Sequence, residues 1–364
     1  MGQKLKIYTD KRYYTPEKVF NWILQPWEKE FGVSHPTEDS ELARYTRNGQ
    51  EYFERTSLED CDIAVSPCQW IEDHTNEDIF ELAQAAKACG KKVLVFYFSD
   101  SEDKVPIDNA IVFRTSLSRS TRTANEFAMP AFFRKPEDFW SKDWEARKKE
   151  PKATVGFCGN VDNRAHETNP LKACLKNLGY SIMKRPKLMC AFESFGISIT
   201  KHKGRKLRTQ LLHAFEKSNA VQTNFLVREF FNNGVGRLSP EKQADAALKA
   251  KQEYIANTLG SDYILTPRGG GNFSYRFYET LSLGRIPLFL NTDCVLPFEE
   301  FINWKDTLLW VEEDELANAP DIAAKVHQQT SEEGFIKKQE ACKTLWKEWL
   351  SYDGFYKNLW RYLA

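Results

Sequence analysis

The sequence has no long apolar run and no net charge, and each absence excludes a class of protein. No stretch approaches the roughly 18 apolar residues of a membrane-spanning helix, and the first residues hold no apolar signal-peptide core. We therefore expect a cytoplasmic protein without a membrane span. Lysine plus arginine and aspartate plus glutamate number 51 each, a balance that argues against nucleic acid as a partner.

The eight cysteines include no pair at the CxxC spacing. Paired spacing is typical of zinc sites and redox centres, and a dense disulfide framework is typical of short secreted chains. We therefore expect reduced, mostly buried thiols and no cysteine-bound metal.

What the sequence does contain is enough apolar material for two cores. Hydrophobic residues make up 41% and aromatic residues 13% of the 364 residues, which suits two folded domains of ordinary size. In the first half, short apolar runs alternate with helical patterns, at 5–8, 17–31, 63–65, 77–89 and 93–98. Such alternation predicts an α/β domain with a parallel sheet.

A polar and charged stretch at 141–152 offers few core residues and predicts a domain boundary. After it, a strand-like run at 154–158 enters a Gly159–Asn160 turn, and a helical pattern follows at 170–178. We therefore predict three parts, 1–150 as a first Rossmann-like domain, 151–330 as a second and 331–364 as C-terminal helices.

The most informative stretch, residues 261–298, reads SDYILTPRGGGNFSYRFYETLSLGRIPLFLNTDCVLPF. Its apolar run Tyr263–Leu265, ended by Pro267, predicts a buried parallel strand. The loop Arg268–Asn272 that follows holds three glycines and no side chain that would block a close approach to the backbone.

A helix and a second strand complete this unit. Ser274 can cap the helix, Gly284 ends it, and the apolar residues 286–290 supply the strand. Amide groups at the start of the helix, its dipole and the guanidinium groups of Arg268 and Arg276 together favour a bound diphosphate. The alternative is a glycine loop that only joins a strand to a helix.

Arg276 and Glu279 share one face of the predicted helix, and Phe277 and Leu281 share the opposite face. The apolar face can pack on a sheet while the charged face meets a ligand. A surface ion pair between Arg276 and Glu279 is the alternative.

This segment resembles the exostosin-type glycosyltransferases of glycosyltransferase family 47, whose signature runs from a strand through Pro-Arg-Gly and a Gly/Ser loop to Arg and then Glu on a helix. The resemblance is specific over 251–311, where Leu296–Glu299 and Trp304 also look like the family, and fainter over 152–250. It implies an α/β fold of the GT-B type, with two facing Rossmann-like domains and a cleft between them. The acceptor would lie in the first domain and the donor in the second, and the C-terminal helices would cross back to the first.

The resemblance also implies roles for particular residues. Glu279 would bind the ribose hydroxyls of the donor, and Arg268 and Arg276 would hold its diphosphate. Further donor-binding candidates are Gly269, Gly270, Asn272, Ser274, Arg205, Arg208 and Asn160. Arg205 and Arg208 belong to a basic stretch before a helical run, and a solvated charged surface is the alternative for both.

Asp60 and Asp62 match the Asp-any-Asp pattern with which metal-dependent, single-domain glycosyltransferases hold a divalent cation. That motif normally follows a buried strand, whereas this pair precedes the run Ile63–Val65. We therefore expect a strand-start cap, no bound metal and no cofactor, with basic residues balancing the leaving diphosphate.

An inverting transfer needs a base that takes the proton from the acceptor hydroxyl. The carboxyl end of a strand in the first domain is the expected place, and Asp100 follows the clearest such strand. Asp10 and Asp73 are competitors, as are Glu72 and His74. A turn aspartate within Ser-Asp-Ser-Glu-Asp is the alternative for Asp100.

Together these features predict an inverting, metal-independent glycosyltransferase that moves a sugar from a nucleotide diphosphate donor to a glycan or glycoprotein acceptor. We expect a UDP-sugar as the donor. A fucosyltransferase-like enzyme with a GDP-sugar donor is the alternative among enzymes. A carbohydrate- or nucleotide-binding protein without turnover is the alternative outside them, since a fold does not guarantee activity.

Overall fold

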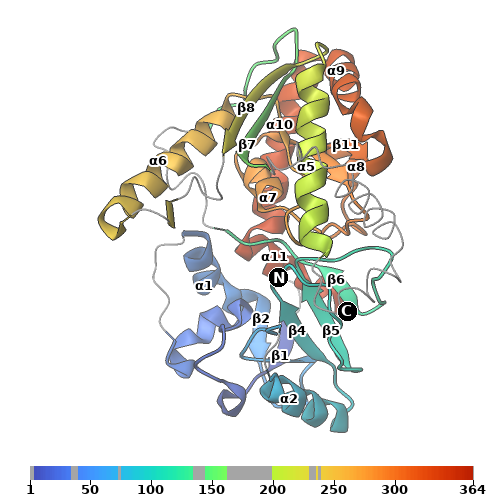
Figure 1. The fold of residues 1–364 in the computed structure, drawn as a ribbon. Helices are drawn as coiled ribbons and strands as arrows, with labels where there is room; N and C mark the ends of the chain where they lie inside the picture. The colour runs from blue at the N-terminus through green and yellow to red at the C-terminus, as the bar shows by residue number, and fades with distance from the viewer. Residues whose placement is uncertain are drawn as a thin grey trace, which may run out of the picture.

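The computed structural model describes residues 4–33, 40–72, 75–133, 144–161, 199–228, 235–236 and 239–363. Figure 1 shows two lobes, with the start of the chain in one and the yellow and orange segments in the other. Each lobe holds one sheet, and all strand pairs in both sheets are parallel. The predicted α/β class is thus confirmed. No helix in these ranges is long and apolar enough to cross a lipid bilayer.

The first sheet has six strands in the order β2-β1-β3-β4-β5-β6. In chain order these are β1 (Leu5–Tyr8), β2 (Phe53–Arg55), β3 (Ile63–Val65), β4 (Val93–Tyr97), β5 (Ala110–Arg114) and β6 (Glu126–Ala128). The helices of this domain are η1 (Lys11–Tyr13), η2 (Trp22–Phe31), α1 (Ser40–Tyr52) and α2 (Glu77–Ala88). Strands β3, β4 and β5 are buried along their whole length, as expected of a parallel sheet covered on both faces.

The predicted elements of this domain are present, with two differences. The helix predicted at 17–31 begins only at Trp22 and is a kinked 3-10 helix with Pro26 inside, because proline cannot donate the hydrogen bond that an α-helix needs there. The sequence analysis missed β2, β5 and β6, which are three to five residues long.

The second sheet has five strands in the order β11-β10-β9-β7-β8. These are β7 (Thr154–Asn160), β8 (Gln222–Arg228), β9 (Tyr263–Leu265), β10 (Ile286–Asn291) and β11 (Leu309–Glu312). The helices around it are α5 (Ile199–Lys217), α6 (Pro240–Leu259), α7 (Tyr275–Ser282), α8 (Trp304–Thr307), η6 (Glu313–Asn318), α9 (Ala319–Gln329) and α10 (Glu332–Leu345). The strands predicted in the glycine-loop segment correspond to β9 and β10. The helix predicted at 170–178 lies outside the described residues.

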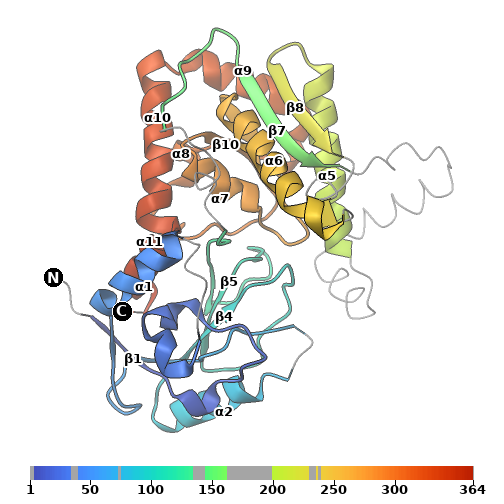
Figure 2. The same ribbon diagram turned by 90° about the vertical axis from the view of Figure 1, so that its left-hand side faces the viewer.

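The chain changes direction across this sheet at β7. From β7 it passes through α5 to β8 on one side, and from β8 it returns through α6 to β9 on the other side of β7. Right-handed crossovers place α5 on one face of the sheet and α6 on the other, and Figures 1 and 2 agree. Such a reversal leaves a crevice at the carboxyl ends of β7 and β9, where open α/β sheets bind their ligands.

The carboxyl ends of the two sheets face each other. The amide of Arg119, after β5, donates to the carbonyl oxygen of Asp293, after β10, at 2.8 Å, and Val295 donates in the same way to Leu117 at 3.1 Å. Beside them, Arg119 donates two hydrogen bonds of 3.0 and 2.7 Å to Glu299. The two Rossmann-like domains thus face each other as the GT-B type requires, and the predicted fold is confirmed.

The C-terminal helices begin in the second domain and end in the first. After α10 come η7 (Trp346–Leu350), α11 (Tyr352–Asn358) and η8 (Leu359–Tyr362), and α11 lies beside α1, as Figure 2 shows. The rings of Tyr356 and Tyr45 are 4.5 Å apart, and Tyr352 stacks on Phe132 at 4.1 Å. The end of the chain therefore completes the core of the domain in which the chain begins.

Phe355 tests this packing, because its fully buried ring contacts Phe113, Phe132 and Phe298 from both domains. We expect Phe355→Ala to lower the free energy of unfolding by about 3–5 kcal/mol, measured by urea denaturation. Trp360→Ala is the control, since that side chain is 47% exposed and its loss should cost less than about 1 kcal/mol. Equal losses in the two variants would contradict the assigned packing.

Candidate functional site

Three of the arginines predicted to bind the donor lie beside β7 and the end of β9. Arg208 on α5 donates from Nη1 to the carbonyl oxygen of Asn160, the last residue of β7, at 2.8 Å. Its Nη2 donates to the carbonyl oxygen of Arg268, after β9, at 3.4 Å. The guanidinium of Arg276, on α7, lies over the ring of Phe157 in β7 at 4.8 Å. Three separate elements therefore supply one arginine each, and we call Arg208, Arg268 and Arg276 the arginine cluster.

The arginine cluster has no carboxylate partner among the residues that the structure describes. The Nε atoms of its three members are buried without a hydrogen-bond acceptor in that part of the chain. Other basic residues nearby do have partners, since Lys203 pairs with Glu313 and Arg228 pairs with Glu253. The cluster therefore makes no direct ion pair with a described carboxylate, although Glu102 acts on Arg268 from a greater distance.

Burial disfavours the charged forms of Arg208 and Arg268. It lowers the pKa of Arg208, and the neighbouring Arg276 and Arg205 lower that pKa further. Burial also lowers the pKa of Arg268, while the carboxylate of Glu102 in the first domain raises it. Guanidinium groups stay protonated in proteins, so a multiply charged anion such as a diphosphate would relieve the repulsion. Arg205 itself lies one turn before Arg208 on α5 and is exposed.

Two glycines let α5 and α7 approach the strands this closely. A Cβ atom on Gly204, in α5, would lie 2.0 Å from the carbonyl oxygen of Gly269, and one on Gly159 would lie 2.4 Å from Nη2 of Arg276. Gly204 was not among the predicted site residues. In the sequence it is one glycine within the basic stretch before the predicted helical run, although in a helix a glycine costs stability unless packing requires it.

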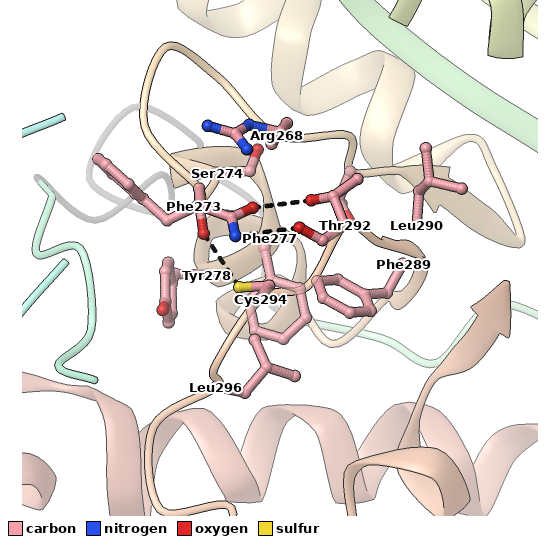
Figure 3. A pocket seen from close by; sticks show the side chains of 12 residues that line it. Arg268, Phe273, Ser274, Phe277, Tyr278, Phe289, Leu290, Thr292, Cys294 and Leu296 are labelled. Atoms are coloured by element: carbon pink, nitrogen blue, oxygen red, sulfur yellow. Dashed lines mark hydrogen bonds between the residues drawn. The ribbon is translucent and has the colours of Figure 1, made fainter. Parts of the chain in front are cut away.

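The glycine loop after β9 is closed by its own hydrogen bonds. The amide of Gly269 donates to the carbonyl oxygen of Phe273 at 2.8 Å, and Nη2 of Arg268 donates to that of Gly270 at 3.2 Å. Ser274 precedes α7 as predicted, but its side chain makes no capping hydrogen bond. Ser274 lies next to Arg268, and both residues line one narrow cavity (Figure 3).

Asn272 is held by hydrogen bonds to both domains. The side chain is fully buried, and its Nδ2 donates to Ser118 Oγ at 2.8 Å and to the carbonyl oxygen of Thr292 at 3.0 Å. Its Oδ1 accepts from Thr292 Oγ1 at 2.7 Å. The amide is thus engaged within the protein and holds the loop between the two domains. A contact of Asn272 with the donor stays a prediction.

Glu279 is held near the arginine cluster by an ion pair. Its Oε1 lies 2.6 Å from Nζ of Lys251 on α6, and 14% of its side chain is exposed. Lys251 also lies over the ring of Tyr254 at 5.3 Å. These contacts fix the carboxylate between α6 and α7. Its contact with a ribose stays a prediction.

Of the candidate bases, Asp100 lies against the glycine loop after β9. A Cβ atom on Gly271 would meet the Cα of Asp100 at 2.9 Å and its carbonyl oxygen at 3.0 Å. Asp100 is exposed, and its charge adds to the effect of burial that raises the pKa of Tyr275, at the start of α7, to about 12. A carboxylate of the first domain therefore stands beside the glycine loop of the second.

The competing candidates differ from Asp100 in their contacts. Asp10 caps η1, accepting from the amide of Arg12 at 2.9 Å and from the hydroxyl of Tyr8 at 3.2 Å. These contacts lie within the first domain and give Asp10 a structural task. Asp73, with His74, lies outside the described residues.

Asp60 and Asp62 serve as local acceptors near the start of β3. Asp62 accepts from the amide of Lys6 at 2.7 Å, and Asp60 accepts from the hydroxyl of Ser57 at 2.9 Å. Within the described ranges, no group of three or more His, Cys, Asp or Glu side chains is arranged to hold a metal ion.

The sequence analysis also missed Glu102, two residues after Asp100. Its carboxylate accepts from the hydroxyls of Ser116 and Ser118. In the sequence it stands among other polar residues that predicted only a turn, so no local signal distinguished it.

Comparisons with known proteins identify the family of the chain. The family model described as the Exostosin GT47 domain matches residues 93–326. Exostosin-1 of Drosophila melanogaster is 30% identical over 148 residues, which are 40% of this chain and 18% of that protein. The Exostosin-1 homolog of Caenorhabditis elegans is 34% identical over 70 residues, 19% of this chain and 18% of that protein. The matched regions thus span less than a fifth of these relatives.

A solved structure of an alpha-glucosyltransferase in complex with UDP and a 13-mer DNA containing a central A:G mismatch is also similar to this chain. It covers 99% of both chains with a TM-score of 0.36 and 10% sequence identity. A likeness at this level carries no argument about the site.

Gly204 tests the close approach of α5 to the donor loop. In Gly204→Ala the new methyl group would displace the backbone of Gly269 and, with it, Arg268, because a backbone oxygen cannot rotate away. We expect the affinity for inorganic pyrophosphate, measured by calorimetry, to fall about tenfold or more, as a strained repacking of 1–3 kcal/mol implies. The control is Gly236→Ala, where the added Cβ meets nothing within 4 Å. Unchanged affinity in Gly204→Ala would contradict the geometry.

Proposed function

Because the chain belongs to the Exostosin GT47 family of glycosyltransferases, we propose that it transfers a sugar from a UDP-sugar to a hydroxyl of a glycan, with inversion and without a metal ion. One observation carries this proposal, namely the arginine cluster at the carboxyl ends of β7 and β9, which makes no ion pair with a described carboxylate. Positive charge at this point suits the diphosphate that becomes the leaving group.

The arginine cluster can supply the counter-charge that the reaction needs. As the bond between the anomeric carbon and the diphosphate oxygen breaks, negative charge grows on the phosphate oxygens. The guanidinium groups of Arg208, Arg268 and Arg276 then gain attraction, and fixed charges in a partly buried site lose little to solvent rearrangement. Electrostatic stabilisation of the leaving group is thus assigned to the protein's own residues.

The rest of the donor would extend from the arginine cluster toward α6 and α7. Glu279 lies one turn after Arg276 and would accept hydrogen bonds from the ribose hydroxyls, while Lys251 holds its carboxylate in place. The nucleoside would then lie over the second sheet and the sugar would point toward the first domain.

We assign the base to Asp100, beside the loop that carries Arg268. Its carboxylate would take the proton from the acceptor hydroxyl as that oxygen forms a bond to the anomeric carbon. UDP leaves from the opposite side with the bonding electron pair, so the configuration at the anomeric carbon inverts. The facing domains would keep water from the reacting bond.

A donor screen tests the proposal directly. The protein is incubated with UDP-glucose, UDP-galactose, UDP-N-acetylglucosamine, UDP-xylose or GDP-fucose and a panel of aryl glycosides, and NMR follows UDP release and the anomeric signal of the product. An inverted product from a UDP-sugar supports the proposal. A product with retained configuration contradicts inversion. Transfer from GDP-fucose alone contradicts uracil as the nucleobase of the donor. Binding of UDP without any turnover favours a binding protein.

Glu279→Ala is expected to weaken UDP binding by about 3–6 kcal/mol, because two hydrogen bonds to a charged acceptor are lost. Calorimetry with UDP measures the change. Glu253→Ala is the control on the neighbouring α6, since Glu253 pairs with Arg228 and is partly exposed. If Glu279→Ala binds UDP as tightly as the parent protein, Glu279 does not hold the ribose.

Asp100→Asn is expected to keep UDP affinity but lower turnover by about a hundredfold to ten-thousandfold, the usual contribution of a general base. An amide cannot accept the acceptor proton, although its shape is the same. Asp10→Asn, which alters a cap of η1, and Asp73→Asn provide comparisons. Turnover near the parental rate in Asp100→Asn would move the role to whichever of these variants fails.

A further inference from the structure

Glu102 is a carboxylate of the first domain that receives three hydroxyl groups and no basic side chain in the described part of the chain. Its Oε1 accepts from Ser118 Oγ at 2.9 Å and from Ser116 Oγ at 3.2 Å, and its Oε2 accepts from Thr121 Oγ1 at 3.3 Å. Ser116 and Ser118 are buried and follow β5. A partly buried charge surrounded by hydroxyls, without a cation bound to it, calls for an explanation.

The same two serines also bind the donor loop of the second domain. The backbone amide of Asn272 donates to Ser116 Oγ at 2.8 Å, and Nδ2 of Asn272 donates to Ser118 Oγ at 2.8 Å. Both groups of Asn272 are donors only, so each serine oxygen must accept there and direct its own proton elsewhere. The proton of each serine points to Glu102, which accepts it because an ionised carboxylate has no proton of its own.

The far side of Asn272 is anchored in the second domain. Thr292 donates to its Oδ1 at 2.7 Å, and Cys294 Sγ donates to its carbonyl oxygen at 3.0 Å. The chain of contacts therefore runs from Glu102 through two serines to Asn272 and on to the end of β10. It crosses the interface at the glycine loop that carries Arg268.

Charge links Glu102 to the same loop a second time. Its carboxylate is the first among the neighbours that favour the charged form of Arg268, whose burial acts in the opposite direction. The charge of Glu102 thus supports both the hydroxyl orientation and a buried arginine of the site.

We propose that Glu102 is a positioning residue for the transfer reaction. Its charge orients Ser116 and Ser118, which hold Asn272 and so keep the donor loop closed against the first domain. This inference rests on the proposed function for its consequence in catalysis, whereas its consequence for the loop does not.

Glu102→Gln tests the proposal, because the amide keeps the shape of the side chain but loses its charge. Its NH2 group is also a hydrogen-bond donor and stands where a carboxylate oxygen accepted a hydrogen bond. Hydrogen exchange in a peptide spanning 268–274 should become about tenfold faster or more, and the dissociation constant of UDP should rise by a similar factor, as loss of a hydrogen bond to a charged group implies. Glu102→Asp should recover part of both. Asp103→Asn is the matched control, since Asp103 lies in the same loop and is exposed. This substitution also replaces a carboxylate with an amide.

Non-additivity gives a second measurement. Because Glu102 acts on the loop through the serines, the variant with Glu102→Gln, Ser116→Ala and Ser118→Ala should show loop exchange little faster than the variant with the two serine changes alone. Additive effects of the glutamate and serine changes on loop exchange would contradict this chain of contacts.

Two outcomes would overturn the proposal. In one, Glu102→Gln leaves loop exchange and UDP affinity at the parental values. In the other, exchange and affinity stay unchanged but turnover is abolished, which would make Glu102 the base. If the parent protein binds no UDP at all, the proposed function fails, and loop exchange alone still decides whether Glu102 holds the loop.

Discussion

Buried positive charge without an ion-pair partner is the constraint on which this structure depends. Arg208, Arg268 and Arg276 lie at the carboxyl ends of β7 and β9 with their Nε atoms buried and without an acceptor among the described residues. Burial lowers the pKa of Arg208 and of Arg268, and Arg276 and Arg205 lower the pKa of Arg208 further. Main-chain carbonyls of Asn160 and Arg268 and the ring of Phe157 lower the cost only in part. An arrangement that is expensive without an anion and favourable with one is the electrostatic signature of a binding site. Glycines at 159 and 204 are required because only their lack of a Cβ lets the helices bring the arginines so close.

The interface between the domains is built around the same loop. On one side the loop carries Arg268, and on the other its Asn272 and Gly271 contact the first domain. Any change in the angle between the domains would therefore move the arginine cluster relative to Asp100. The C-terminal α11 limits such a change, because it packs on the first domain while α10 packs on the second. The position of the loop and the angle between the domains are thus coupled through a few buried contacts.

The fold and the donor loop could be predicted because their signals are local. A buried strand, three glycines and an amphipathic helix lie next to one another in the sequence, and β9, the loop and α7 follow in that order. The contacts of Asn272 could not be predicted, because its partners Ser118 and Thr292 are far away in the sequence. Glu102 and Gly204 were missed for the same reason, since their importance comes from residues of other elements. Asp100 follows β4, the strand that the sequence predicted before it. Its contact with Gly271 could not be predicted, because Gly271 belongs to the other domain.

The most direct test of the central claim is a calorimetric titration of UDP, UMP and uridine in excess EDTA. If the arginine cluster binds the diphosphate without a metal, UDP binds in EDTA and each phosphate removed weakens binding, with more salt dependence for UDP than for uridine. Arg276→Ala should remove most of the difference between UDP and uridine. Loss of UDP binding in EDTA, restored by manganese, would contradict the account.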